Sequence, residues 1–400
     1  MLPDMHQAEP IPDSVRADIE RLLQSGDLFR YTAPDNAPVK LLEQEFAAAM
    51  GARYALAVSS CSAALFLSLA ALGLAPGARV LIPGFTFAAV PSAVIHAGCV
   101  PVLCEVGADY RIDMADFEER LPGCAAVIVS HMRGHTSDMD AILRLCDAAR
   151  VPVIEDAAHS LGTVWRGRKI GTLGRVGCFS FQSYKLINAG EGGVLISDDP
   201  EVIARAVILS GAYEHSWKKH DRAQEPALKA SFERWQNRLP LYNLRLSNLS
   251  AAVIRAQIPE IARRVRDGRA NHDRVAEALR RHPAVHVPRP LDGEERAPDS
   301  LQFSLPGMAA EQIEAFVDGC GAKGLSVQVF GRSRDNARAF WNWGFLPEAV
   351  ELPRTRAMLM QTCDIRLPAR LTAAECDAVT AVLLEALDAA LDVARAPVPA

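Results

Sequence analysis

Short apolar segments alternate with helical segments over the first 260 residues, and this alternation limits the fold more than any other feature of the chain. The helical stretch 62–72, for example, follows an apolar run and ends at Gly73. Strands that are apolar on both faces and separated by helices are typical of a mainly parallel sheet covered on both sides. The sequence therefore predicts an α/β fold with a large three-layer α/β/α domain. The apolar runs lie at 54–59, 78–84, 100–106, 125–132 and 151–156.

Four hundred residues exceed what one hydrophobic core usually contains, so we expect two domains. We place the large domain, with an N-terminal arm, at residues 1–260 and a smaller C-terminal α/β domain at residues 261–400. A long amphipathic helix over about 248–280 should carry the chain from one to the other. A terminal helix over 371–391, capped by Thr372, should close the small domain.

Composition and charge exclude several classes of partner. The net charge of −5 provides no basic surface for nucleic acid or for an anionic membrane. The nine cysteines are scattered without a CxxC pair, which indicates reduced thiols, a cytoplasmic protein and no metal site. The N-terminus lacks the basic start and apolar core of a signal peptide. Prolines and a histidine interrupt the most apolar region, 80–106, so we expect no membrane span.

One lysine stands in a setting that favours catalysis. Lys185 follows an apolar run and precedes a glycine-rich turn, in the segment CFSFQSYKLINAGEGG. Upstream, another apolar run ends in Glu155 and Asp156. Pyridoxal 5'-phosphate (PLP) requires a lysine on a loop beside a buried carboxylate, because the amine forms a Schiff base with the cofactor aldehyde and the carboxylate keeps the pyridine nitrogen protonated. Taken alone, a lysine after a strand is usually a solvated loop residue, so these residues alone make Lys185 and Asp156 candidates for the catalytic residues of a PLP enzyme.

The segment that joins these residues resembles the DegT/DnrJ/EryC1/StrS family of sugar and cyclitol aminotransferases. That family reads E-D-x-A-[HQ], then G-x-x-x-G-x-x-G, then F-S-F, then the lysine and a G-[DE]-G-G turn. Each of these elements stands in order between Glu155 and Gly193. The resemblance implies a fold-type I PLP enzyme of the aspartate aminotransferase superfamily, and the wording of the motifs is nearest to the cyclitol and aminohydroxybenzoate branches.

The family's cofactor site corresponds to residues spread along the chain. Residues 59–65 match its phosphate-binding turn, in which small residues let backbone N–H groups approach a phosphate at a helix start, although Cys61 replaces the family's glycine. Phe87 matches the ring that stacks on the pyridine. Asn243 matches an asparagine that relatives supply to the neighbouring subunit, which implies a homodimer with shared active sites. Taken alone, each residue type also occurs in ordinary packing. The resemblance implies cofactor contacts for Ser60, Cys61, Ser62, Phe87, Asp156, His159, Ser180, Gln182, Lys185 and Asn243.

Three further residues are candidates for contacts with the substrate. Arg133 stands where relatives often carry an aromatic residue, and it either clamps a carboxylate or forms a structural ion pair. His135 presents the same two alternatives. Glu191, in the glycine-rich turn, is either a substrate contact or a solvated charge.

The resemblance implies a PLP-dependent aminotransferase that takes an amino group from glutamate or glutamine and delivers it to a ketone on a sugar, cyclitol or related molecule, in secondary-metabolite or surface-sugar biosynthesis. Another reaction on the same fold is an alternative: an aminohydroxybenzoate-type synthase, a decarboxylase, a lyase or a racemase. A catalytically silent regulatory homologue is an alternative of another class. The presence of both Lys185 and Asp156 argues against that alternative. Sugar dehydratases of the same superfamily carry a histidine at the position of Lys185, so the lysine argues against a dehydratase.

Overall fold

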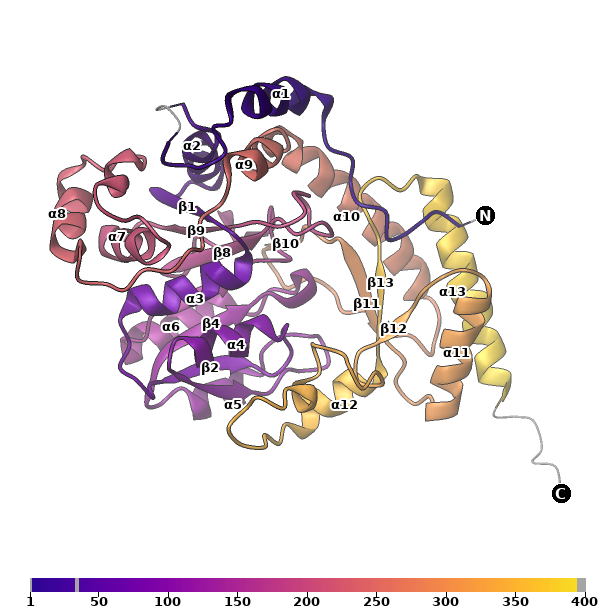
Figure 1. The fold of residues 1–400 in the computed structure, drawn as a ribbon. Coiled ribbons are helices and arrows are strands. Elements are labelled where there is room, and N and C mark those ends of the chain that lie inside the picture. Colours follow the sequence, from indigo (N-terminus) through magenta and orange to yellow (C-terminus); the bar gives the residue numbers. More distant parts are fainter. Residues whose placement is uncertain (1, 33–35, 394–400) are drawn as a thin grey trace.

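A computed structural model describes residues 2–32 and 36–393, and its architecture is that of a large α/β domain beside a smaller one (Figure 1). The large domain occupies the indigo-to-magenta half of the ribbon, and the small domain is coloured orange and yellow. The predicted α/β class is confirmed by this arrangement, in which the large domain contains a mainly parallel sheet.

The centre of the large domain is a seven-stranded sheet in the order β1-β9-β8-β5-β4-β2-β3. The neighbours from β8 to β3 pair in parallel, whereas β9 runs antiparallel to both β1 and β8. Parallel neighbours end at the same edge of a sheet, so the last residues of β4, β5 and β8 lie close together there. The strands are β1 (Tyr54–Val58), β2 (Arg79–Pro83), β3 (Val100–Cys104), β4 (Cys124–Ser130), β5 (Val153–Asp156), β8 (Val176–Ser180) and β9 (Gly193–Ser197).

Helices cover both faces of this sheet, and each face has its own apolar cluster. One cluster includes Leu65, Val94 and Val207, and the other includes Phe46, Phe117 and Ile142. The strands are buried on both sides because each face contacts a helix layer, as their continuous apolar sequence predicts. The first face carries α3 (Cys61–Leu72), α4 (Ala89–His96), α7 (Pro200–Leu209) and α8 (Pro226–Trp235); the second carries α2 (Pro38–Met50), α5 (Met114–Arg120), α6 (Met139–Ala149) and α9 (Asn248–Arg255).

The small domain packs helices against an antiparallel sheet in the order β11-β13-β12. Its apolar cluster includes Leu301, Phe316 and Leu383. Thr372 accepts from the Glu375 N–H at 3.3 Å while the Glu375 carboxylate accepts from the Thr372 N–H at 2.7 Å, so the predicted cap of the terminal helix is present as a capping box. The elements are α10 (Ile261–Leu279), β11 (Ser300–Ser304), α11 (Ala310–Ala322), β12 (Gln328–Val329), α12 (Pro353–Gln361), β13 (Thr362–Arg366) and α13 (Ala373–Val393).

The single long helix predicted over 248–280 is wrong. The chain forms α9, a short 3-10 turn at Ile258–Glu260, and then α10. Pro259 lies in the turn and has no N–H to continue the ladder. We keep the division into two domains after residue 260 as a proposal. Two residues pack in the domain to which the division does not assign them: Met5 in the small-domain cluster and Phe340 in the large-domain cluster.

The remaining elements are short or peripheral. A second antiparallel sheet has the order β10-β6-β7 and lies beside the central one. No helix within residues 2–32 and 36–393 is long and apolar enough to cross a membrane. All nine cysteines are free and buried. These elements are β6 (Val164–Trp165), β7 (Arg168–Lys169), β10 (Glu294–Glu295), α1 (Arg16–Ser25) and the 3-10 turns Asp13–Val15, Met132–Gly134, Ser216–Lys219 and Phe340–Asn342.

Candidate active site

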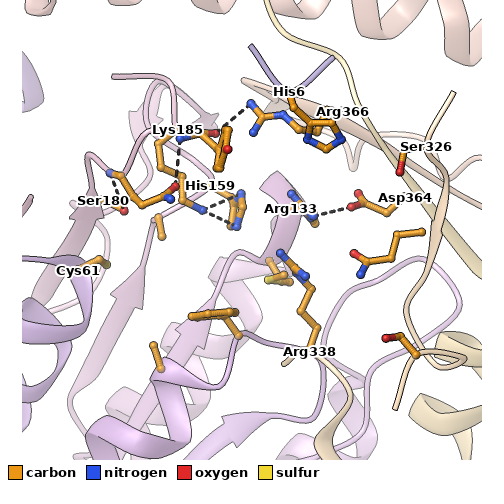
Figure 2. A pocket seen from close by; sticks show the side chains of 18 of the residues that line it. His6, Cys61, Arg133, His159, Ser180, Lys185, Ser326, Arg338, Asp364 and Arg366 are labelled. Atoms are coloured by element: carbon orange, nitrogen blue, oxygen red, sulfur yellow. Dashed lines mark hydrogen bonds and ion pairs between the residues drawn. The ribbon is translucent and has the colours of Figure 1, made fainter. Parts of the chain in front are cut away.

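A cavity of about 1060 Å³ lies between the carboxyl edge of the central sheet and the small domain (Figure 2). Its walls come from the end of β5, the start of α3, the turn after β8 and the small-domain strands β12 and β13. The structure brings most of the predicted site residues together on these walls. They are Ser60, Cys61, Ser62, Phe87, Arg133, Asp156, His159, Ser180, Gln182, Lys185 and Glu191.

Lys185 reaches His159 from the turn that follows β8. The lysine Nζ lies 2.7 Å from Nε2 of His159 and 3.3 Å from its Nδ1. Burial lowers the pKa of Lys185 from 10.5 to about 8, and the negative charge of Asp299 partly opposes that effect. A substantial fraction of the amine is therefore neutral near pH 8, which is the form that attacks an aldehyde.

His159 links the lysine to the small domain. Its Nδ1 lies 3.6 Å from Oδ2 of Asp299, the residue before β11. Burial and the nearby Lys185 lower the pKa of His159 to about 3, so the ring is neutral at pH 7. With its proton on Nδ1 facing Asp299, the ring can accept a hydrogen bond from Lys185 at Nε2. Burial alone would raise the pKa of the Asp299 carboxyl, but the contact with His159 and the positive charge of Lys185 hold that pKa far below its usual range.

Asp156 is fixed at the end of β5 by hydrogen bonds from two elements. Ser130, the last residue of β4, donates to Oδ2 at 2.7 Å, and the Ala158 N–H donates to Oδ1 at 3.2 Å. Thr86 donates in turn to the Ser130 hydroxyl at 2.8 Å. These contacts hold the carboxylate in the cavity wall, ready to face a positively charged group.

Glu155, the neighbour of Asp156, serves a different purpose. In a strand, successive side chains point to opposite faces, so only one of the two faces the cavity. Glu155 is buried and accepts three backbone N–H groups, from Gly171 at 2.8 Å, Leu173 at 2.7 Å and Gly174 at 2.6 Å. The first half of the E-D motif therefore anchors the glycine motif, and the second half faces the site.

The start of α3 offers hydrogen-bond donors to an anion. Ser60 caps the helix by accepting from the Ala63 N–H at 3.1 Å, which leaves the first N–H groups of a twelve-residue helix directed at the cavity end. Gly193 of β9 packs against this turn, and a Cβ there would lie 2.4 Å from the Ser60 carbonyl carbon. Burial, with Asp156 nearby, holds the pKa of Cys61 well above its usual range, so its side chain is a neutral thiol.

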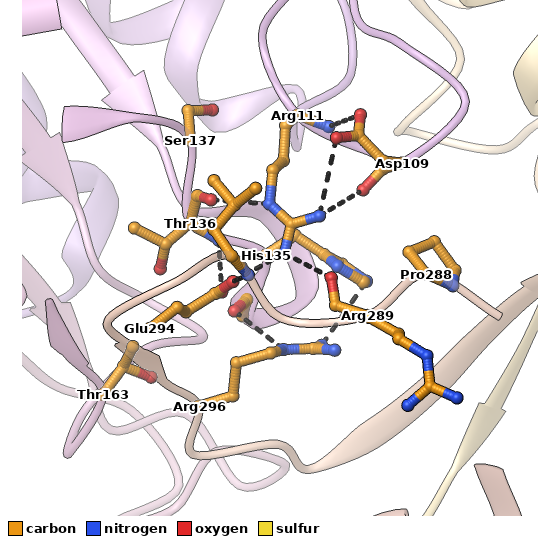
Figure 3. Close-up of polar contacts among 12 residues, drawn as sticks. Asp109, Arg111, His135, Thr136, Ser137, Thr163, Pro288, Arg289, Glu294 and Arg296 are labelled. Carbon is orange, nitrogen blue, oxygen red and sulfur yellow. Dashed lines mark hydrogen bonds and ion pairs between the residues drawn. The ribbon is translucent and has the colours of Figure 1, made fainter. Parts of the chain in front are cut away.

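Two predicted residues lie outside the cavity wall. Asn243 is exposed on the segment that precedes α9. His135 is buried, and one ring nitrogen lies 2.9 Å from Gln302 Oε1, among Arg111, Glu294 and Arg296 (Figure 3). Burial and the nearby arginines hold the pKa of His135 well below its usual range. Because it does not line the cavity, His135 is placed to support the site rather than to contact a substrate.

Arg133 forms the structural ion pair that was one of its two alternatives, and contact with a substrate carboxylate stays a prediction. It lines the cavity, and its Nη2 donates to Oδ2 of Asp364 in β13 at 2.5 Å. Its backbone adopts the left-handed region with φ at 54°, which is strained for a residue with a Cβ. Arg296 supports this conformation by donating to the Arg133 carbonyl at 3.2 Å.

Sequence reasoning missed polar residues that the other strands and the small domain add to the cavity wall or place directly behind it. Ser130 stands at the end of an apolar run like Asp156, so strand alignment could have found it. Asp299 and Asp364 carry no local motif, and neither do the arginines at the cavity wall. The missed residues are Thr86, Ser130, Asp299, Arg332, Arg338, Asp364 and Arg366.

The sequence profile of the DegT/DnrJ/EryC1/StrS aminotransferase family matches residues 13–384. The chain belongs to this family. The resemblance seen in the motifs is thus confirmed across most of the chain, and the protein is a PLP-dependent aminotransferase of fold type I.

Individual relatives narrow the comparison within the family. The chain is 31% identical to 3-amino-5-hydroxybenzoate synthase of Amycolatopsis mediterranei over 345 residues, 85% of this chain and 84% of that protein. It is 31% identical to a putative L-glutamine:3-amino-2,3-dideoxy-scyllo-inosose aminotransferase of Micromonospora echinospora, over 60% of this chain and 56% of that one. The solved structure of 3-amino-5-hydroxybenzoic acid synthase superposes with a TM-score of 0.83 at 27% identity, covering 99% of this chain and 100% of the other.

The residues present fit PLP, the cofactor of this family. Lys185 supplies an amine of lowered pKa, Asp156 a fixed carboxylate and α3 a helix start with serine hydroxyls. These groups match the aldehyde, the pyridine nitrogen and the phosphate of the cofactor. Within the described chain, no group of three or more histidine, cysteine or acidic side chains could bind a metal ion.

Proposed function

We propose that this aminotransferase takes its amino group from L-glutamate or L-glutamine and delivers it to a ketone on a sugar, a cyclitol or a related ring. The observation that most directly supports amino transfer is the short contact between Lys185 and His159 in a cavity that Asp156 also lines. The name of the Micromonospora relative, which specifies both L-glutamine and an inosose, supports the donor and the acceptor class.

The reaction needs a residue that moves a proton and residues that fix charges. PLP, when bound, supplies a ring that accepts electrons from the substrate carbon. When the donor amine replaces the lysine on the cofactor, Lys185 Nζ would be free to act as a base. It would remove the proton from the donor Cα and return it to the cofactor carbon that keeps the amino group. His159 orients that nitrogen through its neutral ring, and Asp156 stabilises positive charge on the pyridine nitrogen.

The donor is tested by adding single amino acids to the PLP-loaded protein and recording the visible absorbance of the cofactor. We expect L-glutamine or L-glutamate to convert the cofactor to its amino form, while other amino acids leave the spectrum unchanged. Lys185→Ala is the matched control, because it keeps the cavity but has no amine to move the proton. If no amino acid converts the cofactor, the protein does not carry out transamination from a free amino acid.

An aminohydroxybenzoate-type synthase is a second candidate, favoured by the full-length superposition on the solved synthase. An aromatic amine differs from an aminated sugar or cyclitol in its ring protons. Nuclear magnetic resonance of the product formed from a cyclic ketone therefore separates the two: aliphatic ring protons indicate amino transfer alone, and aromatic protons indicate the synthase reaction.

We also propose that the protein acts as a homodimer in which Asn243 serves the cofactor site of the neighbouring subunit. Asn243 is exposed beside Leu241 and Tyr242, whose exposed fractions are 48% and 45%. Arg245 fixes this segment by donating to the Gly211 carbonyl at 2.7 Å. An ordered, apolar and exposed segment of this kind is typical of a surface that packs against another chain.

Subunit mixing tests the shared site. Lys185→Ala and Asn243→Ala chains should each form weakly active or inactive homodimers. A heterodimer of the two has one site with both defects and one with neither, so activity should recover towards half that of the parent. Verified subunit exchange without recovery would show that Asn243 does not act in the partner's site.

A further inference from the structure

The part of the cavity opposite Lys185 contains an arginine without a counter-charge. Arg338 lines the cavity from the segment 331–343, and Figure 2 shows its side chain extending toward Arg133. Within residues 2–32 and 36–393, its guanidinium forms no hydrogen bond and no ion pair, and its Nε is shielded from solvent. A guanidinium removed from water is costly to leave unpaired.

Each of the other arginines of the cavity has a polar partner for its guanidinium, although within the part of the chain that the structure describes the Nε atom has none in any of them. Arg133 pairs with Asp364 at 2.5 Å, and Arg332 pairs with Glu314 at 2.7 Å. Arg366 donates to the Tyr184 carbonyl at 3.3 Å and lies over the Tyr184 ring. Among the cavity arginines of the described chain, Arg338 is therefore the one whose guanidinium has neither a hydrogen bond nor an ion pair.

The segment that carries Arg338 is fixed before any ligand arrives. The Ala88 N–H donates to the Ala337 carbonyl at 3.0 Å, which ties the segment to the large domain. Trp343 Nε1 donates to the same carbonyl at 2.9 Å, and the Arg338 N–H donates to Asn336 Oδ1 at 2.9 Å. A guanidinium on a fixed segment loses little freedom when a ligand binds.

The surroundings of Arg338 are aromatic and cationic. Its Cζ lies 5.9 Å from the centre of the Phe87 ring and 5.7 Å from that of Phe330. Burial and the positive charge of Arg133 lower the pKa of Arg338 to about 10, while Asp364 and Asp299 oppose this from beyond ion-pair distance. The side chain is therefore charged at pH 7, and an anion beside it would relieve both unfavourable effects.

We infer that this end of the cavity binds a carboxylate of the substrate, with Arg338 as its main partner and Arg133 beside it. This inference rests on the proposed aminotransferase function and assigns the residues that recognise a carboxylate in its cavity. A guanidinium matches a carboxylate with two parallel N–H donors. The carboxylate belongs either to the amino donor or to the ketone acceptor, and the experiments below separate these sources.

Binding of unreactive probes tests the inference without turnover. The probes are cyclohexanecarboxylate and its neutral isostere cyclohexanecarboxamide, titrated calorimetrically into the PLP-loaded protein. We expect the carboxylate to bind about 10- to 100-fold more tightly than the amide, as a charge-assisted hydrogen bond provides. Arg338→Gln should abolish this preference. Arg332→Gln, which removes the same charge from the same segment but from a residue already paired with Glu314, should retain it.

Two outcomes would overturn the inference: equal affinity of the folded parent for both probes, as expected if a carboxylate of a partner chain already neutralises Arg338, or a preference that survives Arg338→Gln. Circular dichroism of each variant shows whether it is folded. If Arg338→Gln does not fold, Arg338→Lys replaces it, because a point charge without the paired N–H groups should reduce the preference without removing the charge.

Half-reactions identify the source of the carboxylate. If it belongs to the donor, Arg338→Gln should raise the L-glutamine concentration needed for half-maximal conversion of the cofactor. If it belongs to the acceptor, that concentration should stay the same, and the amino form should react faster with 3-oxocyclohexanecarboxylate than with its amide only in the parent. Failure of every amino acid to convert the cofactor would contradict the proposed function. The calorimetric comparison of carboxylate and amide would still test the carboxylate site, because it needs no turnover.

Discussion

The two ends of the cavity are built in different ways. The end around Lys185 and Asp156 comes from the contiguous motif segment 155–193 and the turn before α3, all within the large domain. The end around Arg133 and Arg338 joins a 3-10 turn of the large domain to small-domain segments that lie about two hundred residues further along the chain. The first end contains the groups that fit the cofactor, which is common to the family, and the second contains the groups that we assign to the substrate.

This difference assigns the chemical reaction to the end around Lys185 and the choice of substrate to the end around Arg338. Changes at the cofactor end should abolish or slow the reaction for every substrate, whereas changes at the arginine end should alter which ligand binds. The following predictions test that separation, and they run from the largest expected effect to the smallest.

Lys185→Ala should abolish turnover and the visible absorbance of the protein-bound Schiff base, because the alanine has no amine to attach the cofactor or to move the proton. Absorbance spectroscopy and borohydride reduction measure the attachment, and circular dichroism monitors the fold. Lys229→Ala, at an exposed lysine of α8, is the control and should keep both signals. A reducible Schiff base in Lys185→Ala would assign the attachment to another lysine.

Asp156→Asn should slow turnover by about 10²–10³-fold while the protein still binds PLP, because an amide cannot stabilise positive charge on the pyridine nitrogen. Stopped-flow kinetics of the half-reaction measures the rate, and equilibrium dialysis measures the bound cofactor. Ser130 can still donate to the remaining side-chain oxygen, but the Ala158 N–H then faces the new amide, so the melting temperature should fall slightly. A rate close to that of the parent would mean that another group supplies the charge.

Glu155→Gln should lower the free energy of unfolding by about 1–3 kcal/mol and leave the chemical step nearly unchanged. The carboxylate accepts three backbone N–H groups through two oxygens, and the amide replaces one acceptor with a donor. Denaturant unfolding measures the loss, with Asp156→Asn as the matched neighbour. If Glu155→Gln slowed the half-reaction as much as Asp156→Asn does, the two carboxylates would not have separate roles.

The sequence predicts the cofactor end well because its chemistry is local. Lys185, Asp156 and the turn at Ser60 stand next to strand ends, and a parallel sheet places such ends at one edge. The alternation of strands and helices likewise predicts the sheet that carries them. Unbroken helical periodicity did not reveal the turn at Pro259, where the missing N–H overrides the pattern.

The arginine end is not predictable in the same way, because its contacts join residues far apart in the chain. The pair between Arg133 and Asp364 spans 231 positions, and nothing near either residue specifies the other. Arg338 differs from the other cavity arginines because its guanidinium has no hydrogen-bond or ion-pair partner among the described residues. That difference is visible only once the surrounding segments are folded. His135 shows the converse: it lies two residues from Arg133, yet it packs behind the cavity.

Asp299 joins the two ends, and its removal should have the smallest effect of the four. The neutral amine of Lys185 attacks the PLP aldehyde, so the rate of Schiff-base formation by the apoprotein should rise with pH around a midpoint near the lysine pKa of about 8. Asp299 raises that pKa, so Asp299→Asn should lower the midpoint by roughly one pH unit. Stopped-flow absorbance after mixing apoprotein with PLP, recorded across the pH range, measures the midpoint. Asp318→Asn removes a charge from another cavity residue that is not among the main causes of the shift at Lys185, so its midpoint should stay close to that of the parent. An unchanged or higher midpoint in Asp299→Asn would show that the small domain does not tune the lysine and that the two ends of the cavity act independently.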